Sequence, residues 1–211
     1  MADGRTRAER KEATRQRLLD VTLSLITSRS LDSISLREVA REAGIVPTAF
    51  YRHFDSMDDL GVALVDESMQ PLRQLVRDAR RGSQTNADII SGTVEILARQ
   101  VHDNKGKFRF ISRERYGGVV AVRRAIQTEL RLFTSELSVD LARLTAGGNW
   151  TSEDIEMAAD LMISAMLAIV LDLLEIDPRR RDQAATIERA EKQLRLIALG
   201  MAGWHSEISQ A

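Results

Sequence analysis

The stretch REAGIVPTAFYRHFDS, residues 41–56, places three aromatic residues in five positions, directly after a Gly-Ile-Val-Pro break. Only 4% of the chain is aromatic, so this crowding is a local feature. A short helix is predicted to begin at Pro47, because the missing N–H of proline costs nothing at the first helical position. A helix of two turns has little stability alone, so tertiary packing must hold it.

Two phenylalanines can supply that packing on one face of the short helix. At 100° per residue, Phe54 lies about 40° from Phe50, and both are predicted to pack inward with Ile45 or Val46. The opposite face and the flanks then offer a hydroxyl, a methyl, a phenol and a guanidinium, on Thr48, Ala49, Tyr51 and Arg52. Such groups suit the reading of base edges and the holding of phosphates.

Another short helix is predicted just before this one, at residues 36–43. Ser35 offers an N-cap with Glu38 three residues on, which is the capping-box pattern. Gly44 can end the helix because glycine tolerates a positive φ. The pair forms a helix-turn-helix with residues 46–54 as the recognition helix. From spacing alone, an ordinary helical hairpin is the alternative.

Helical periodicity continues along the rest of the chain. Further helices are predicted at 9–28, 58–81, 87–103, 105–115, 118–145, 152–176 and 184–206. No internal repeat or convincing strand is evident, so an all-α protein is predicted. A long helix from residue 58 would join a small amino-terminal head of three helices, residues 1–56, to a larger helical bundle, residues 57–211.

The composition excludes several classes of protein. The chain has no cysteine, so a disulfide framework and thiolate metal sites are excluded. The start MADGRTRAERKEATRQ lacks the apolar stretch of a secretory signal. In the most apolar segment, residues 158–176, Asp160 and Asp172 leave eleven uncharged residues between them, too few to cross a bilayer. We expect an intracellular, cytoplasmic protein.

The amino terminus is basic although the whole chain is not. Residues 1–17 carry six basic and three acidic side chains, whereas the net charge of the chain is −1. A basic arm on a neutral body fits a nucleic-acid contact, and a solvated tail is the alternative.

The segment SLREVAREAGIVPTAFYRHFDSMDDL, residues 35–60, resembles the DNA-binding signature of TetR-type transcriptional regulators. The matching positions are Leu36, Val39, Ala40, Ala43, Gly44, Tyr51, Phe54 and Leu60. Chain length and helix pattern also fit, so the resemblance covers the chain. It implies a dimeric repressor of a pseudo-palindromic operator in double-stranded DNA. Residues 1–56 would be its DNA-binding domain, and residues 57–211 its ligand-binding and dimerisation domain.

The resemblance also implies which residues contact DNA. Contacts from the recognition helix would come from Thr48, Ala49, Tyr51 and Arg52. Phosphate contacts would come from Ser35 and Arg37, and a flexible arm would carry Arg5 and Arg7. His53 adjoins the packed face and is either a phosphate contact or a cap.

Two carboxy-terminal helices are predicted to form a homodimer interface through roughly residues 152–176 and 184–206. The first is apolar almost all the way round and must be covered on several sides. The second carries a near-heptad seam, made of Ile187, Ala190, Leu194, Ile197, Met201 and Trp204. Closure of the protomer's own core by both helices is the alternative.

A narrower resemblance concerns the effector. Segments outside the head, among them FRFISRERYG at 108–117 and VRRAIQTEL at 122–130, are similar to FabR and DesT. Those are repressors of unsaturated fatty-acid synthesis that respond to acyl-coenzyme A thioesters. The resemblance implies that this chain senses long-chain acyl-coenzyme A and regulates genes of fatty-acid synthesis or desaturation.

The side chains of the bundle are compatible with such an effector. An apolar tunnel is predicted from Phe108, Phe110, Ile111, Phe133, Met162 and Met166, in which methionine adapts to a flexible chain. Phosphates of coenzyme A are predicted to meet Arg113 or its neighbours Arg109, Arg115, Arg123 and Arg124. Ordinary core packing and solvated arginines are the alternatives.

Other functional classes fit the sequence less well. The three histidines are scattered, and there is no glycine-rich phosphate loop or nucleophile elbow, so no catalytic site, metal site or cofactor is predicted. An architectural DNA-binding protein would have little use for the large bundle. A TetR-type repressor that responds to a different apolar small molecule, such as a drug or a metabolite, is the main alternative.

Overall fold

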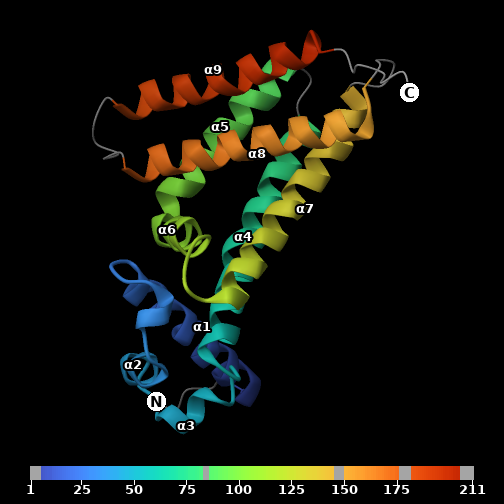
Figure 1. Ribbon diagram of the computed structural model, residues 1–211. Helices are drawn as coiled ribbons and strands as arrows, with labels where there is room; N and C mark the ends of the chain where they lie inside the picture. Colours follow the sequence, from blue (N-terminus) through green and yellow to red (C-terminus); the bar gives the residue numbers. More distant parts are fainter. Residues whose placement is uncertain (1–5, 83–85, 145–149, 176–181, 205–211) are drawn as a thin grey trace. The chain divides into compact units, whose positions relative to one another are not determined.

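The computed structural model describes residues 6–82, 86–144, 150–175 and 182–204. These residues form nine α-helices and one 3₁₀ turn, with no strand among them, which confirms the all-α prediction (Figure 1). In chain order the elements are α1 (Arg7–Ile26), η1 (Leu31–Ser33), α2 (Leu36–Glu42), α3 (Pro47–Phe50), α4 (Met57–Gly82), α5 (Asn86–Asp103), α6 (Lys105–Glu114), α7 (Val120–Leu144), α8 (Ser152–Glu175) and α9 (Asp182–Ala202). Apart from α3, each helix lies within a few residues of its predicted bounds.

The chain folds into two compact units. Unit 1 comprises residues 1–70 and 106–127, and unit 2 comprises residues 71–105 and 128–211. Unit 1 therefore contains the helix-turn-helix together with nearly all of α6 and the first turns of α7. Both α4 and α7 contribute residues to each unit.

The start of α2 is capped as predicted, with one difference. The hydroxyl of Ser35 accepts from the backbone N–H of Glu38 at 3.2 Å. The Glu38 carboxylate does not complete a capping box; it accepts from Arg29 at 2.6 Å. Arg29 thereby ties the chain before α2 to its first turn, and it lowers the pKa of Glu38 below its usual value.

The end of α2 forms a Schellman motif. Gly44 has a φ of 70°, the left-handed conformation that glycine adopts most readily. The N–H of Ile45 donates to the carbonyl of Ala40 and that of Gly44 to the carbonyl of Arg41, both at 3.0 Å. These bonds satisfy two terminal carbonyls of α2 and turn the chain sharply toward α3.

The recognition helix is regular over fewer residues than predicted. Only Pro47–Phe50 is α-helical, and the chain reaches Phe54 through turns, in which the N–H of His53 donates to the carbonyl of Phe50 at 2.9 Å. The inward face is as predicted, because Phe50 and Phe54 are both buried, with ring centroids 5.8 Å apart. Arg15 of α1 lies over the Phe54 ring, 5.1 Å from its centroid. Packing rather than helix length therefore holds this segment.

In unit 2, α5, α8 and α9 pack against one another, and Figure 1 shows α8 and α9 side by side. Leu141 of α7 and Ala158 and Ala159 of α8 are at the centre of one buried cluster. By length and composition alone α8 could cross a membrane, with 39% of its most apolar window buried. A core helix of a soluble protein passes the same test, so this is weak evidence for a membrane span.

The dimer seam predicted on α9 requires a correction at two of its six positions, whereas Trp204 of the same seam is exposed. Leu194 is only 5% exposed and Ala190 is 1% exposed, so both lie in the core of the protomer itself. The large apolar side chains that α9 exposes are Leu196 and Leu199, at 71% and 65%, together with Trp204 beyond its end. Both stripes have nearly the same period, so periodicity alone could not tell the inner one from the outer one.

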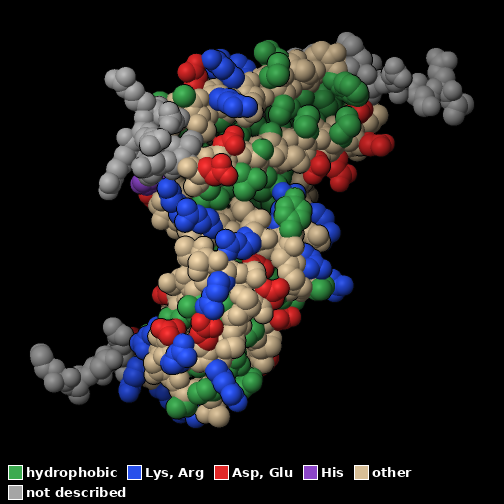
Figure 2. All heavy atoms as spheres, turned by 60° about the vertical axis from the view of Figure 1, so that its left-hand side comes forward, with side chains coloured by type: hydrophobic (Ala, Val, Ile, Leu, Met, Phe, Trp, Pro, Cys, Tyr) green, Lys and Arg blue, Asp and Glu red, His purple; other side chains and the backbone are tan. Residues whose placement is uncertain are grey.

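The outer side of α8 also carries an apolar stripe. Residues at alternating spacings of four and three are exposed along it, namely Met157, Leu161, Ser164, Ala168 and Leu171. Figure 2 shows hydrophobic side chains gathered over the α8–α9 end of the molecule. Both helices thus have an uncovered apolar side in a single protomer.

Candidate nucleic-acid interface

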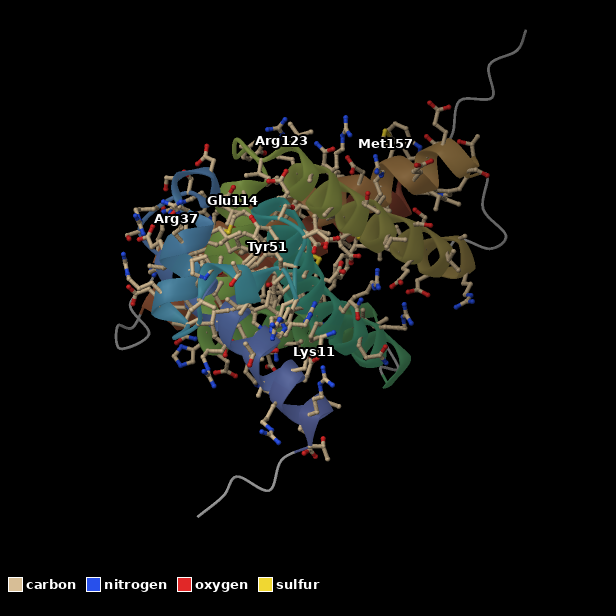
Figure 3. The ribbon with its side chains drawn as sticks, turned by 90° about the horizontal axis from the view of Figure 1, so that it is seen from below. Lys11, Arg37, Tyr51, Glu114, Arg123 and Met157 are labelled. Carbon is tan, nitrogen blue, oxygen red and sulfur yellow. The ribbon has the colours of Figure 1, made fainter. Side chains whose placement is uncertain are left out.

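The short α3 and the turns after it present the predicted polar side chains to solvent. Thr48 and Arg52 are exposed, Tyr51 is 60% exposed, and Ala49 is half-buried. Figure 3 looks at this end of unit 1 and shows Tyr51 between Lys11 of α1 and Arg37 of α2. A hydroxyl, a phenol and a guanidinium therefore lie on one accessible face.

The cations of residues 6–56 include two contrasting groups. Arg29 and Arg41 form ion pairs with Glu38 and Glu42. By contrast, no ion pair within the described residues involves the exposed cations Arg7, Lys11, Arg37 and Arg52. Cations without a carboxylate partner are available to neutralise phosphates.

Sequence reasoning missed Lys11. The α1 helix brings Lys11 and Arg15 near His53, beside Arg52. Burial lowers the pKa of His53, and the charges of Lys11, Arg15 and Arg52 lower it further. The Nδ1 of His53 is buried and has no hydrogen-bond partner in the described structure. The Glu12 carboxylate also acts on this ring and raises its pKa, and it pairs with Arg15 at 3.9 Å. Lys11 and Arg52, which form no ion pair among the described residues, are therefore the cations of this group that are available to hold an anion.

Val46 was predicted to pack inward as an alternative to Ile45, but the structure assigns that position to Ile45. Ile45 is half-buried, whereas Val46 is 64% exposed. Val46 is the N-cap of α3, where its extended backbone, with φ −73° and ψ 146°, directs the side chain away from the core. An apolar side chain at this place can contact the methyl group of thymine.

Helix α1 begins two residues earlier than predicted and therefore includes Arg7. Arg7 is the first residue of α1 instead of part of a flexible arm, because Thr6 and Glu9 form a complete capping box. Arg5 lies outside the described residues. Ser35 is exposed even though its hydroxyl caps α2, so the hydroxyl can still donate to a phosphate.

The candidate ligand residues are divided between the two units. Phe108, Phe110, Ile111 and Arg113 belong to unit 1, whereas Phe133, Met162 and Met166 belong to unit 2. Phe110, Ile111 and Phe133 are buried, and Met162 packs against the cluster around Ala159. Arg113 already donates to two backbone carbonyls within unit 1. Contact of any of these residues with a ligand remains a prediction.

Comparison with known families decides the identity of the fold. Residues 18–64 match the family model described as bacterial regulatory proteins of the tetR family, and residues 86–203 match the tetracyclin repressor-like C-terminal domain. The chain belongs to the TetR family. It is therefore a DNA-binding transcriptional regulator and not an enzyme.

Solved structures agree with this assignment at the level of the TetR fold. The fatty acid degradation regulator FadR of Bacillus halodurans has a TM-score of 0.72 and 16% identity, over 86% of this chain and 94% of its own. FadR of Bacillus subtilis, solved with stearoyl-CoA, has a TM-score of 0.71 and 14% identity, over 85% and 96%. A TetR-like regulator of Rhodococcus sp. RHA1 has a TM-score of 0.68 and 19% identity, over 95% and 100%.

Proposed function

We propose that this TetR-family regulator is a homodimeric repressor whose affinity for its operator depends on long-chain acyl-coenzyme A. The observation that carries the proposal is the likeness of fold to a FadR that binds stearoyl-CoA. The similarity of residues 108–117 and 122–130 to FabR and DesT supports the same class of effector from the sequence. On that similarity, its target genes are those of fatty-acid synthesis or desaturation.

The DNA-binding part of the proposal rests on the accessible face of unit 1. Arg52, Tyr51 and Thr48 would enter the major groove, while the unpaired cations Lys11 and Arg37 would hold phosphates on either side. A two-fold symmetric dimer reads two half-sites about one helical turn apart, so the operator would be a pseudo-palindrome.

The dimer part of the proposal rests on the exposed apolar stripes of α8 and α9. Leu161 and Leu171 of α8 and Leu196 and Leu199 of α9 are each more than half exposed in a single protomer. Large apolar patches rimmed by polar residues mark interaction sites. A second copy that packs the same two helices on these stripes would form a four-helix interface.

The experiment starts with selection of DNA from a random pool by the full-length protein. We expect a pseudo-palindromic operator with half-site centres about 34–36 Å apart. Long-chain acyl-coenzyme A should change operator affinity, and free coenzyme A, which lacks the acyl chain, is the control. An operator that responds to neither would favour the alternative, a repressor of another apolar small molecule. Mass spectrometry of compounds that co-purify with the protein would then identify that molecule.

A further inference from the structure

The end of α6 binds the connection between α1 and α2. The Nη1 of Arg113 donates to the carbonyl oxygens of Ile26 and Arg29, at 2.9 and 2.8 Å. The adjacent Glu114 accepts from the backbone N–H of Leu31 through Oε1, at 2.9 Å. The last carbonyls of a helix lack partners within it, and α1 ends at Ile26, so the guanidinium acts as a C-terminal cap.

Glu114 is completely buried, which makes its bond to Leu31 important. A buried polar group that loses its partner retains the full penalty of desolvation. Leu31 is itself buried and lies close to α4, because a Cβ added at Gly61 would come within 2.6 Å of its Cδ2. The bond therefore fixes a residue that is already enclosed by packing.

The turn between α6 and α7 has glycine at two positions where a side chain would collide with a neighbouring carboxylate. A side chain at Gly117 would collide with the carboxylate of Glu114, and one at Gly118 would collide with that of Asp32. Arg123 of α7 donates to the carbonyls of both glycines, at 2.5 and 3.3 Å. Figure 3 labels Glu114 and Arg123 within unit 1.

The segment that these bonds hold leads directly into the helix-turn-helix. The side chain of Arg29 bonds Glu38 in the first turn of α2, and Ser35 caps the same turn. Only a few residues therefore separate the segment bound by α6 from the start of α2. A shift of this segment would move α2, and α3 would move with it.

We propose that Arg113 and Glu114 are positioning residues for DNA reading, which act by holding the α1–α2 connection so that α2 and α3 meet the operator in one orientation. The proposal rests on the proposed function as a sequence-specific DNA-binding protein. It gives Arg113 a role that does not involve coenzyme A. It also makes operator affinity depend on residues that lie 59 and 60 positions after Phe54, the end of the recognition segment.

The test uses full-length variants on the operator that the wild-type protein selects. Glu114→Ala and Arg113→Met should each lower operator affinity about tenfold, while affinity for random DNA and the salt slope stay unchanged. Glu95→Ala and Arg99→Met, both at exposed positions of α5, are the controls and should leave both affinities unchanged. Hydrogen exchange at the Leu31 amide should become faster in Glu114→Ala only.

Each other outcome has a definite meaning. Equal losses on operator and random DNA, with a smaller salt slope, would make Arg113 a direct phosphate contact and would overturn the proposal. Wild-type operator affinity with a rapidly exchanging Leu31 amide would overturn it as well. If Glu114→Ala does not fold, Arg113→Met alone is the test, and wild-type operator affinity in that variant would overturn the proposal. Glu114→Gln keeps an oxygen that can accept from the Leu31 amide, so it should retain wild-type affinity. A wild-type protein that selects no operator would refute the proposed function instead.

Discussion

At the end of the recognition segment, His53 is a titratable ring close to Lys11, Arg15 and Arg52. Burial first, and then these three charges, lower its pKa below the usual value of 6.5. In the unfolded chain the ring regains its ordinary pKa, so at a given pH it is protonated to a greater extent than in the folded protein. The contribution of His53 to stability is therefore present above about pH 6.5 and decreases as the pH falls below it.

We predict that the free energy of unfolding decreases more steeply with falling pH in the wild-type protein than in His53→Gln. Urea denaturation at several pH values between about 8 and 5.5 measures it. His102→Gln, which changes an exposed histidine of α5, is the control and should retain the wild-type slope. The same pH dependence in His53→Gln would show that the surroundings of the ring do not lower its pKa.

The exposed side chain of Val46 leads to a prediction on the DNA. Replacement of thymine by uracil removes only the C5 methyl group, which a valine at the N-cap of α3 can contact. One uracil position in the half-site should weaken wild-type binding about fourfold, roughly 0.8 kcal/mol for one buried carbon. Val46→Ala should bind the thymine operator less tightly and should lose this sensitivity to uracil. Equal sensitivity in both proteins would exclude Val46 as the reader of that methyl.

Lys11 can be tested separately from base reading. Its replacement by alanine should reduce the slope of log affinity against log salt by about 0.9 if it neutralises one phosphate. Arg17→Ala is the matched control, because Arg17 is also exposed on α1 but lies about 240° further round the helix. An unchanged slope in Lys11→Ala would show that the lysine is only solvated.

For the residues of the site, the sequence was informative where packing was strong. The burial of Phe50 and Phe54 followed from their spacing, and so did the exposure of Thr48 and Arg52. The orientation of Val46 could not be predicted from spacing, because Val46 precedes the helix and a regular rotation of 100° per residue does not apply to it. Lys11 was missed because its place beside the recognition segment depends on how α1 packs.

Among the elements, α8 and α9 show both the strength and the limit of a periodic pattern. Their positions were predicted to within a few residues, because long helices repeat the same signal many times. The sequence did not predict which side of α9 is buried, because Leu194 and Leu196 belong to stripes of nearly the same period. The stripe of Leu194 is buried and that of Leu196 is exposed. Only contacts with α5 and α8 select the inner stripe.

The difference between the buried and the exposed apolar stripe of α9 leads to a prediction about assembly. A charge at Leu161 or Leu199, introduced as Leu161→Glu or Leu199→Glu, should prevent the proposed dimer from forming without unfolding the protomer. An unpaired charge in a dry interface costs about 3–5 kcal/mol. The same change at the buried Leu194 should lower thermal stability. Sedimentation and thermal unfolding measure the two effects, with Ala142→Glu, at an exposed position of α7, as the control. A dimer that survives both changes on the stripes would move the interface to another surface.

On the scale of the whole molecule, the boundary predicted at residue 56 follows the sequence pattern, and it remains a prediction. The family models also divide the chain, into residues 18–64 and 86–203. In the structure, residues 106–127 belong to the same compact unit as residues 1–70, with bonds such as those of Arg113 and Glu114 between them. Bonds between segments this far apart leave no local pattern in the sequence, so no periodicity could reveal them.

The two helices shared by both units, α4 and α7, bear on the proposed sensing of acyl-chain shape. Because α4 and α7 contribute residues to both units, a change in the packing of unit 2 can reach unit 1 along continuous helices. A cis double bond bends an acyl chain, and a closely packed interior must move helices to accept it.

We therefore predict that saturated and monounsaturated acyl-coenzyme A of equal length change operator affinity to different extents. Only a difference in affinity for the DNA-bound and free states of the protein can drive such a response. The measurement is a titration of operator binding with the matched pair of thioesters, and Leu161→Glu, if monomeric, would show whether the response requires the dimer. Two identical curves would exclude sensing of chain shape, whereas a difference of tenfold would correspond to about 1.4 kcal/mol of coupling between the ligand and the operator.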